Sequence, residues 1–99
     1  MEQMQIDPEN LISIDFENGP YSKTIRTFRP DVYTEDGTYY ALLGPDKATG
    51  ILGSGAGPDE ALLDWDKQLA VFISQKHSPD DPVAEFVFDT LGTSKKDVG

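Results

Sequence analysis

Hydrophobic and polar residues alternate near the start of the chain, which is the pattern of a half-buried strand. Ile12, Ile14 and Phe16 are separated by single polar residues, so their side chains would share one face of a strand. Every charged residue among residues 1–20 is acidic, and an Asn-Gly-Pro turn ends the stretch. We therefore predict that residues 1–20 form an acidic N-terminal arm, which could supply an extra strand and lies on the domain through these apolar side chains.

Three later runs also have the character of strands. Residues 24–34 are rich in Thr, Ile, Phe, Val and Tyr, as strands are. Pro30 lies within this run and cannot donate a ladder hydrogen bond, so it indicates an edge strand or a bulge. A hairpin turn with Gly37 follows, because glycine readily adopts positive φ, and residues 38–43 return as the partner strand. Residues 51–54 form a short further strand.

A helical period replaces the strand period after the glycine-rich residues 53–57. Pro58 suits the first helical turn, and the two acids after it suit the positive end of the helix dipole. One apolar stripe recurs at helical spacing and consists of Ala61, Leu62, Trp65, Leu69, Phe72 and Ile73. We predict a helix over residues 58–75, with Trp65 at the centre of the core.

The valine- and phenylalanine-rich residues 83–88 are predicted to form a last strand, and residues 92–99 a flexible tail. A single amphipathic helix needs a sheet to cover its apolar stripe. The predicted fold class is therefore α+β: a small antiparallel sheet of three to five strands with one amphipathic helix packed on one face, in the order β-β-β-α-β. The domain itself spans residues 21–91, between the arm and the tail.

The charge of the chain restricts the kind of partner it can bind. Asp and Glu number 18 against 8 Lys and Arg, for a net charge of −10. This balance argues against direct binding to nucleic acid or to an anionic membrane, and it suits solubility or docking onto a basic protein. The chain has no cysteine, no signal-peptide pattern and no apolar stretch of bilayer length. We expect a cytoplasmic protein.

No pattern typical of catalytic, cofactor-binding or metal-binding residues is present, so the chain is not predicted to be an enzyme. Residues 53–57 resemble a phosphate-binding loop but lack its Gly-Lys-Ser end, and acids that would repel phosphate follow them. A flexible entry into the helix is the favoured interpretation, and small-ligand binding is the open alternative. Asp80 and Asp81 are interpreted as turn formers, and His77 could cap the carbonyls at the end of the predicted helix.

The local basic cluster of the chain is expected to pair with the acidic arm or with the acids of the helix. It consists of Lys23, Arg26 and Arg29.

An ordered series of short motifs links the hairpin to the helix. It runs through Glu35-Asp36-Gly37, Tyr39-Tyr40-Ala41-Leu42, Pro45-Asp46, Gly50, Gly53-Ser54-Gly55 and Pro58-Asp59-Glu60-Ala61-Leu62. In this order the motifs resemble the HicB family of antitoxins, over residues 33–72. The resemblance implies a partial ribonuclease H-like fold, here as a single domain without the DNA-binding segment that the family often carries. It also implies an oligomer whose partner is a small ribonuclease toxin.

Charge and resemblance together favour a small acidic protein-binding module that inhibits a basic partner, such as a ribonuclease toxin. The alternative is an orphan or phage-encoded acidic decoy, a nucleic-acid mimic that blocks a host defence or DNA-binding protein. An exposed strand edge is expected to allow a homodimer or a higher oligomer. We predict that the contacts with the partner come from Asp31, Tyr33, Glu35, Asp36, Tyr39, Asp59, Asp64 and Asp66.

Overall fold

A computed structural model describes residues 3–78 and 80–92, and these residues contain one antiparallel sheet with helices packed on it. The strands are β1 (Leu11–Ile12), β2 (Asp31–Glu35), β3 (Thr38–Leu43) and β4 (Ile51–Gly55), and they lie side by side in that order. The helices are α1 (Lys23–Phe28), α2 (Pro58–Ser74) and α3 (Pro82–Leu91). The predicted α+β class with a small antiparallel sheet is confirmed.

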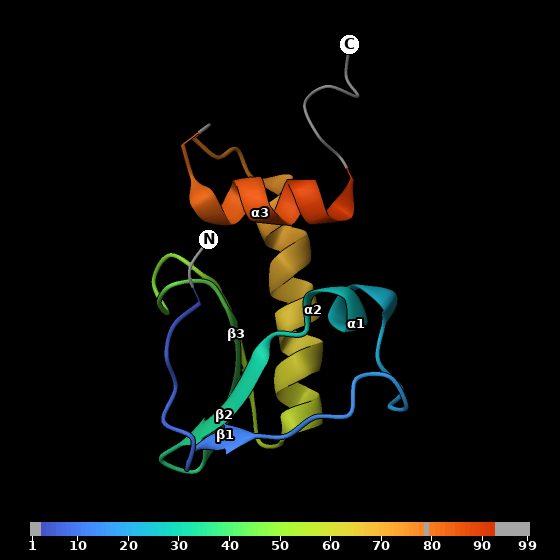
Figure 1. Cartoon of the computed structure of the whole chain (residues 1–99), viewed down its shortest axis with the longest axis vertical. Coiled ribbons are helices and arrows are strands. Elements are labelled where there is room, and N and C mark those ends of the chain that lie inside the picture. The colour runs from blue at the N-terminus through green and yellow to red at the C-terminus, as the bar shows by residue number, and fades with distance from the viewer. Residues whose placement is uncertain (1–2, 79, 93–99) are drawn as a thin grey trace.

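The sheet is covered on both of its faces. Figure 1 shows α2 along one face, α1 beside α2, and α3 across the C-terminal end of α2. The N-terminal arm runs along the other face, where Met4 N donates a hydrogen bond to Gly44 O at 2.8 Å. The side chain of Gln3 accepts from Gly44 N at 2.9 Å and donates to Leu42 O at 2.8 Å. Leu42 points toward the arm and is fully buried, so the arm is part of the folded domain.

The hairpin between β2 and β3 has the turn that the sequence predicts. Asp36 and Gly37 have φ values of 52° and 82°, and Glu35 pairs with Thr38 on either side of them. Two consecutive residues with positive φ give a turn whose twist matches that of the flanking strands. The predicted strands at residues 38–43 and 51–54 are confirmed as β3 and β4.

The predicted helix over residues 58–75 is confirmed as α2, with Gln75 as its C-cap. Its buried residues are Ala61, Leu62, Trp65 and Leu69. Trp65 is 0 % exposed and packs against the ring of Phe28, with 5.9 Å between the ring centroids. The prediction that Trp65 lies at the centre of the core is therefore confirmed.

The glycines of β4 let α2 lie directly on the sheet. A Cβ atom at Gly53 would overlap the backbone of Ala61 and Trp65, and one at Gly55 would overlap the backbone of Ala61 and the Cβ of Glu60. Gly53 and Gly55 are therefore required by the close approach of a helix, not by the flexible entry that we predicted. α2 then begins after Gly57, its N-cap.

The predicted strand at residues 24–34 is wrong in its first half, which forms α1. Ser22 caps this helix, with its Oγ accepting from Ile25 N at 3.2 Å, and the buried residues Ile25 and Phe28 lie one turn apart. Arg29 ends the helix in the left-handed conformation at φ 50°. Pro30 then precedes β2, which pairs on one side with β1 and on the other with β3. The predicted edge strand around Pro30 is therefore wrong as well.

The predicted strand at residues 83–88 is also wrong, because these residues belong to α3. Asp81 caps the helix through Val83 N and Ala84 N, Pro82 occupies its first turn, and Gly92 ends it at φ 75°. Val83, Ala84 and Val87 are buried at helical spacing. For residues 3–78 and 80–92, the predicted order β-β-β-α-β with a single helix is thus corrected to β-α-β-β-β-α-α. Of the predicted tail at residues 92–99, residues 93–99 lie outside the described residues.

Only part of the alternating segment predicted in the arm forms a strand. β1 comprises two residues and pairs with β2, Leu11 opposite Tyr33 and Ile12 opposite Val32. Ile14 and Phe16 lie beyond the strand, but both are partly buried against the core. The apolar residues of the arm therefore hold it on the domain, as predicted, without extending the strand.

Candidate partner-binding surface

The predicted partner-binding residues of the sheet lie on two different faces. Side chains alternate along a strand, and Val32 of β2 belongs to the core beneath α2. Asp31, Tyr33 and Glu35 therefore lie together on the opposite face, which carries the arm. Tyr39 of β3 lies on the α2 side, where it is partly buried against the core. The structure brings the first three residues together and separates Tyr39 from them.

Two of the three predicted acids of α2 are occupied within the fold. Asp59 Oδ1 accepts a hydrogen bond from the hydroxyl of Tyr21 at 3.0 Å. Asp64 Oδ2 accepts from the backbone N–H of Ser54 in β4 at 2.9 Å. Asp66 is partly buried on the same helix. Asp59 thus ties α2 to Tyr21, and Asp64 ties it to β4. The acids of α2 do not join the sheet residues in one surface.

A compact group of side chains lies on the arm-bearing face of the sheet and consists of Tyr33, Tyr40, Glu35 and Lys47. We call it the tyrosine–lysine cluster. The two tyrosine rings are stacked, with 5.3 Å between centroids and 26° between planes. Lys47 Nζ lies 5.7 Å from the centroid of Tyr33 and 5.1 Å from that of Tyr40, and 3.0 Å from Glu35 Oε1.

Burial and charge set the protonation of this cluster. Tyr33 is only 3 % exposed, and its hydroxyl has no hydrogen-bond partner among the described residues. Burial raises the pKa of Tyr33 above its ordinary value, against the opposing effect of the nearby Lys47 charge. The hydrogen bond to Glu35 raises the pKa of Lys47. Both shifts favour the protonated form, so Tyr33 is neutral and Lys47 is charged at physiological pH.

Two members of the cluster, Tyr40 and Lys47, were not among the residues predicted from the sequence to contact the partner. Tyr40 lies directly opposite Tyr33 in the hairpin, so the hairpin register alone could have placed them together. Lys47 reaches the cluster from the connection between β3 and β4, where no strand register fixes the path of the chain.

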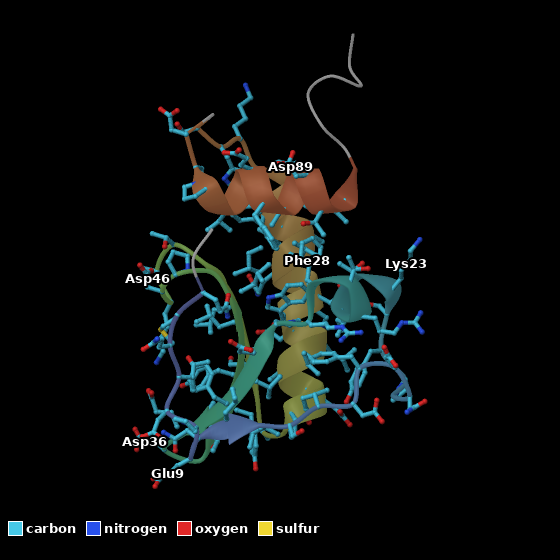
Figure 2. All side chains as sticks on the ribbon, in the orientation of Figure 1. Glu9, Lys23, Phe28, Asp36, Asp46 and Asp89 are labelled. Atoms are coloured by element: carbon cyan, nitrogen blue, oxygen red, sulfur yellow. The ribbon has the colours of Figure 1, made fainter. Side chains whose placement is uncertain are left out.

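The end of the molecule opposite α3 is acidic. Figure 2 shows Glu9 and Asp36 next to each other there. The turn of the arm that contains Glu9 is held against β2 by a hydrogen bond from Thr34 N to Asn10 O at 3.0 Å. We call Asp7, Glu9 and Asp36 the acidic tip; all three are exposed. Asp36 directly follows Glu35, so the acidic tip adjoins the tyrosine–lysine cluster.

Cations of the chain neutralise few of its carboxylates. Over residues 3–78 and 80–92, the ion pairs are Arg29 with Glu17 at 3.1 Å, Lys47 with Glu35 at 3.0 Å, and His77 with Asp81 at 3.6 Å, the last only when His77 is protonated. The Arg29 pair confirms, for this residue of the basic cluster, the predicted pairing with the acidic arm. Most of the negative charge thus remains available to an external cation.

At the outer edge of the sheet next to α2, carboxylates of α2 occupy backbone N–H groups that a further strand would need. The edge strand is β4, and the N–H of Ser54 is bound to Asp64. Just beyond β4, the N–H of Ala56 donates to Glu60 Oε2 at 2.9 Å. A docking strand needs free N–H groups on the edge it joins. The carboxylates of α2 therefore work against the edge pairing that we expected to produce a dimer.

A groove of about 570 Å³ lies where the connection between β3 and β4 meets the end of α2 and the start of α3. His77 is on its wall, and its ring stacks on Phe72 with 4.0 Å between centroids. His77 Nε2 donates to the carbonyl oxygen of Phe72 at 2.6 Å, which confirms the predicted capping role. Of the two predicted turn formers, Asp80 lies in a turn, whereas Asp81 is the N-cap of α3.

Comparisons of the chain with protein-family models, curated proteins and solved structures find no match. No group of three or more His, Cys, Asp or Glu side chains with the geometry to hold a metal ion occurs in the part of the chain that the structure describes. In that same part, no helix has the length and apolar character needed to cross a membrane.

Proposed function

We propose that this protein is a small acidic module that binds a basic protein and inhibits it, a ribonuclease toxin being the partner class that the HicB resemblance implies. The observation that carries the proposal is the excess of carboxylates that form no ion pair among the residues that the structure describes. The net charge is −10, and the described residues form few ion pairs. A basic protein would supply the missing cations and would be drawn to the module by long-range attraction.

The acidic tip and the adjoining tyrosine–lysine cluster are the proposed contact surface. Four of the residues first expected to touch the partner lie on or beside it: Asp31, Tyr33, Glu35 and Asp36. Aromatic side chains supply contact area, and carboxylates supply orientation and rate of association. The acids of α2 are less suited to this role, because Asp59 and Asp64 already accept hydrogen bonds from Tyr21 and Ser54.

Capture from the native lysate tests the proposal. The tagged protein is compared with a variant of its acidic tip, Glu9→Gln with Asp36→Asn, and with a control on α3, Glu85→Gln with Asp89→Asn. Each double variant removes two negative charges, and asparagine tolerates the positive φ of position 36. We expect a basic protein that is retained at low salt and released at high salt. The tip variant should lose it and the α3 control should keep it.

A functional readout completes the test. If the retained protein is a ribonuclease, adding the module in equimolar amount should suppress its cleavage of RNA. Retention that added DNA abolishes would instead favour the acidic decoy. Failure to retain any basic protein at low salt would contradict the proposal.

A further inference from the structure

In the tyrosine–lysine cluster, the chain holds its own cation, Lys47, against a carboxylate and two aromatic rings. A carboxylate and the faces of two aromatic rings together attract a positive charge. Lys47 supplies that charge, 3.0 Å from Glu35 and above the rings of both Tyr33 and Tyr40. The ammonium group therefore shows where a cation is stabilised on this face of the sheet.

The hold on Lys47 is weak enough for another cation to replace it. The side chains of Lys47 and Glu35 are 41 % and 52 % exposed, and exposed ion pairs contribute little because water and salt screen them. Lys47 lies on the connection between β3 and β4, so its side chain can turn into solvent without disturbing the sheet. Once it turns away, the carboxylate of Glu35 is left beside the two rings without its cation.

Arginine fits the vacated site better than lysine does. Its planar guanidinium group can bind a carboxylate through two hydrogen bonds and stack on an aromatic ring at the same time. Tyr40 is partly exposed and offers a ring, and Glu35 offers the carboxylate. The hydroxyl of Tyr33, buried beside them without a partner among the described residues, is a further acceptor.

We propose that the tyrosine–lysine cluster is the anchor for an arginine side chain of the basic partner, and that Lys47 moves aside to admit it. This inference rests on the proposed function, because it names the residue through which the partner is held. Lys47 then competes with any cation that enters the site. A cation that cannot bind the carboxylate and stack on a ring at the same time displaces it poorly, so the site selects arginine.

The test uses a capped Gly-Arg-Gly peptide and its citrulline analogue, which has the same shape without the charge. Binding is followed by the amide NMR shifts of the full chain and of three variants. Lys47→Met removes the competing charge and keeps the length of the side chain. Lys67→Met removes an equal charge from the exposed surface of α2. Glu35→Gln, added to Lys47→Met, removes the carboxylate of the site.

We expect Lys47→Met to bind the arginine peptide about five- to tenfold more tightly than the unmodified chain, since one exposed ion pair and its cation–π contacts no longer compete. The shifts should centre on Glu35 and Tyr40, and the added Glu35→Gln should remove the gain. The proposal is overturned if Lys67→Met produces the same gain, if the citrulline peptide binds equally well, or if the Lys47→Met protein shows no shifts at the cluster.

The same variants separate this inference from the proposed function. If the lysate yields a basic partner that Glu35→Gln and Lys47→Met hold as tightly as the unmodified chain does, the function stands and the anchor is wrong. If the peptide binds as expected and no partner is captured, the cluster stands as an arginine-binding site and the proposed function fails.

Discussion

Replacing Gly53 by alanine is the sharpest test of how α2 is seated on the sheet. The new methyl group would point from β4 into the backbone of the helix, at Ala61 and Trp65. Gly53 does not have a positive φ, so alanine suits its backbone conformation and only the lack of space opposes it. The structure thus attributes the destabilising part of this substitution to packing.

The loss of stability in Gly53→Ala depends on how far the backbone of α2 must shift to make room for the methyl group. Overpacking a core by a methylene typically costs about 1–3 kcal/mol, and the upper end applies here because a helix backbone cannot turn aside as a side chain can. The lower chain entropy of alanine in the unfolded state returns about 0.4–1 kcal/mol. We therefore expect Gly53→Ala to lower the free energy of unfolding by about 2–3 kcal/mol. In a domain of this size, that corresponds to a fall in Tm of roughly 10–20 °C.

Thermal unfolding followed by the fluorescence of Trp65 measures this change. Gly57→Ser is the matched control, because it adds a larger side chain at a position with nothing within 4 Å. Serine is also a better N-cap than glycine, so the control should keep or slightly raise Tm. A Gly53→Ala protein that melts within about 2 °C of the unmodified chain, roughly 0.5 kcal/mol or less, would refute direct contact between α2 and β4.

Three further outcomes can be measured. Trp65→Ala should cost about 3–5 kcal/mol in urea or heat unfolding, because it empties the centre of the core; an unchanged midpoint would place the indole outside it. Asp64→Ala should free the N–H of Ser54 on the edge of β4 and increase self-association in sedimentation, whereas a purely monomeric variant at high concentration would show that this carboxylate does not protect the edge. Hydrogen bonds, chiefly from the backbone of Thr49, lower the pKa of Asp46, so this contribution to stability is present above the ordinary aspartate pKa and is lost as pH falls through the lowered value; an NMR titration midpoint at the ordinary value would contradict this.

The sequence predicts an element correctly where the composition and the hydrophobic pattern of the segment indicate the same secondary structure. β3 pairs with β2 over residues 38–42 and with β4 over residues 39–43, and α2 has an apolar stripe after Pro58. The errors occur where composition and capping disagree. Residues 24–28 and 83–88 have strand-like composition, but Ser22 and Asp81 cap helices in front of them. Side-chain hydrogen bonds to the first free N–H groups outweighed the weaker preference of β-branched and aromatic residues for strands.

The candidate surface was predictable only where a strand register determines it. Tyr33 and Glu35 share a face because they are two residues apart on β2, and Tyr40 follows from pairing across the hairpin. The contacts of Lys47, Asp59 and Asp64 depend on the paths of loops and on the angle at which α2 crosses β4. These contacts arise where segments that are distant in sequence pack together. Local sequence patterns therefore do not predict them.

The order of the strands has a consequence for how the chain reaches this structure. β2, β3, β4 and α2 follow one another in sequence and pack on their immediate neighbours, so residues 31–74 can assemble through short-range contacts. Contacts between segments that are close in sequence lower the contact order, which favours faster folding. The arm, by contrast, is separated in sequence from the strands it contacts. β1 pairs with the edge of β2 that faces away from β3, and Met4 contacts Gly44, just beyond the end of β3. We therefore expect the arm to dock late and to open first, so that its amides, starting with that of Met4, exchange with solvent ahead of those in the hairpin.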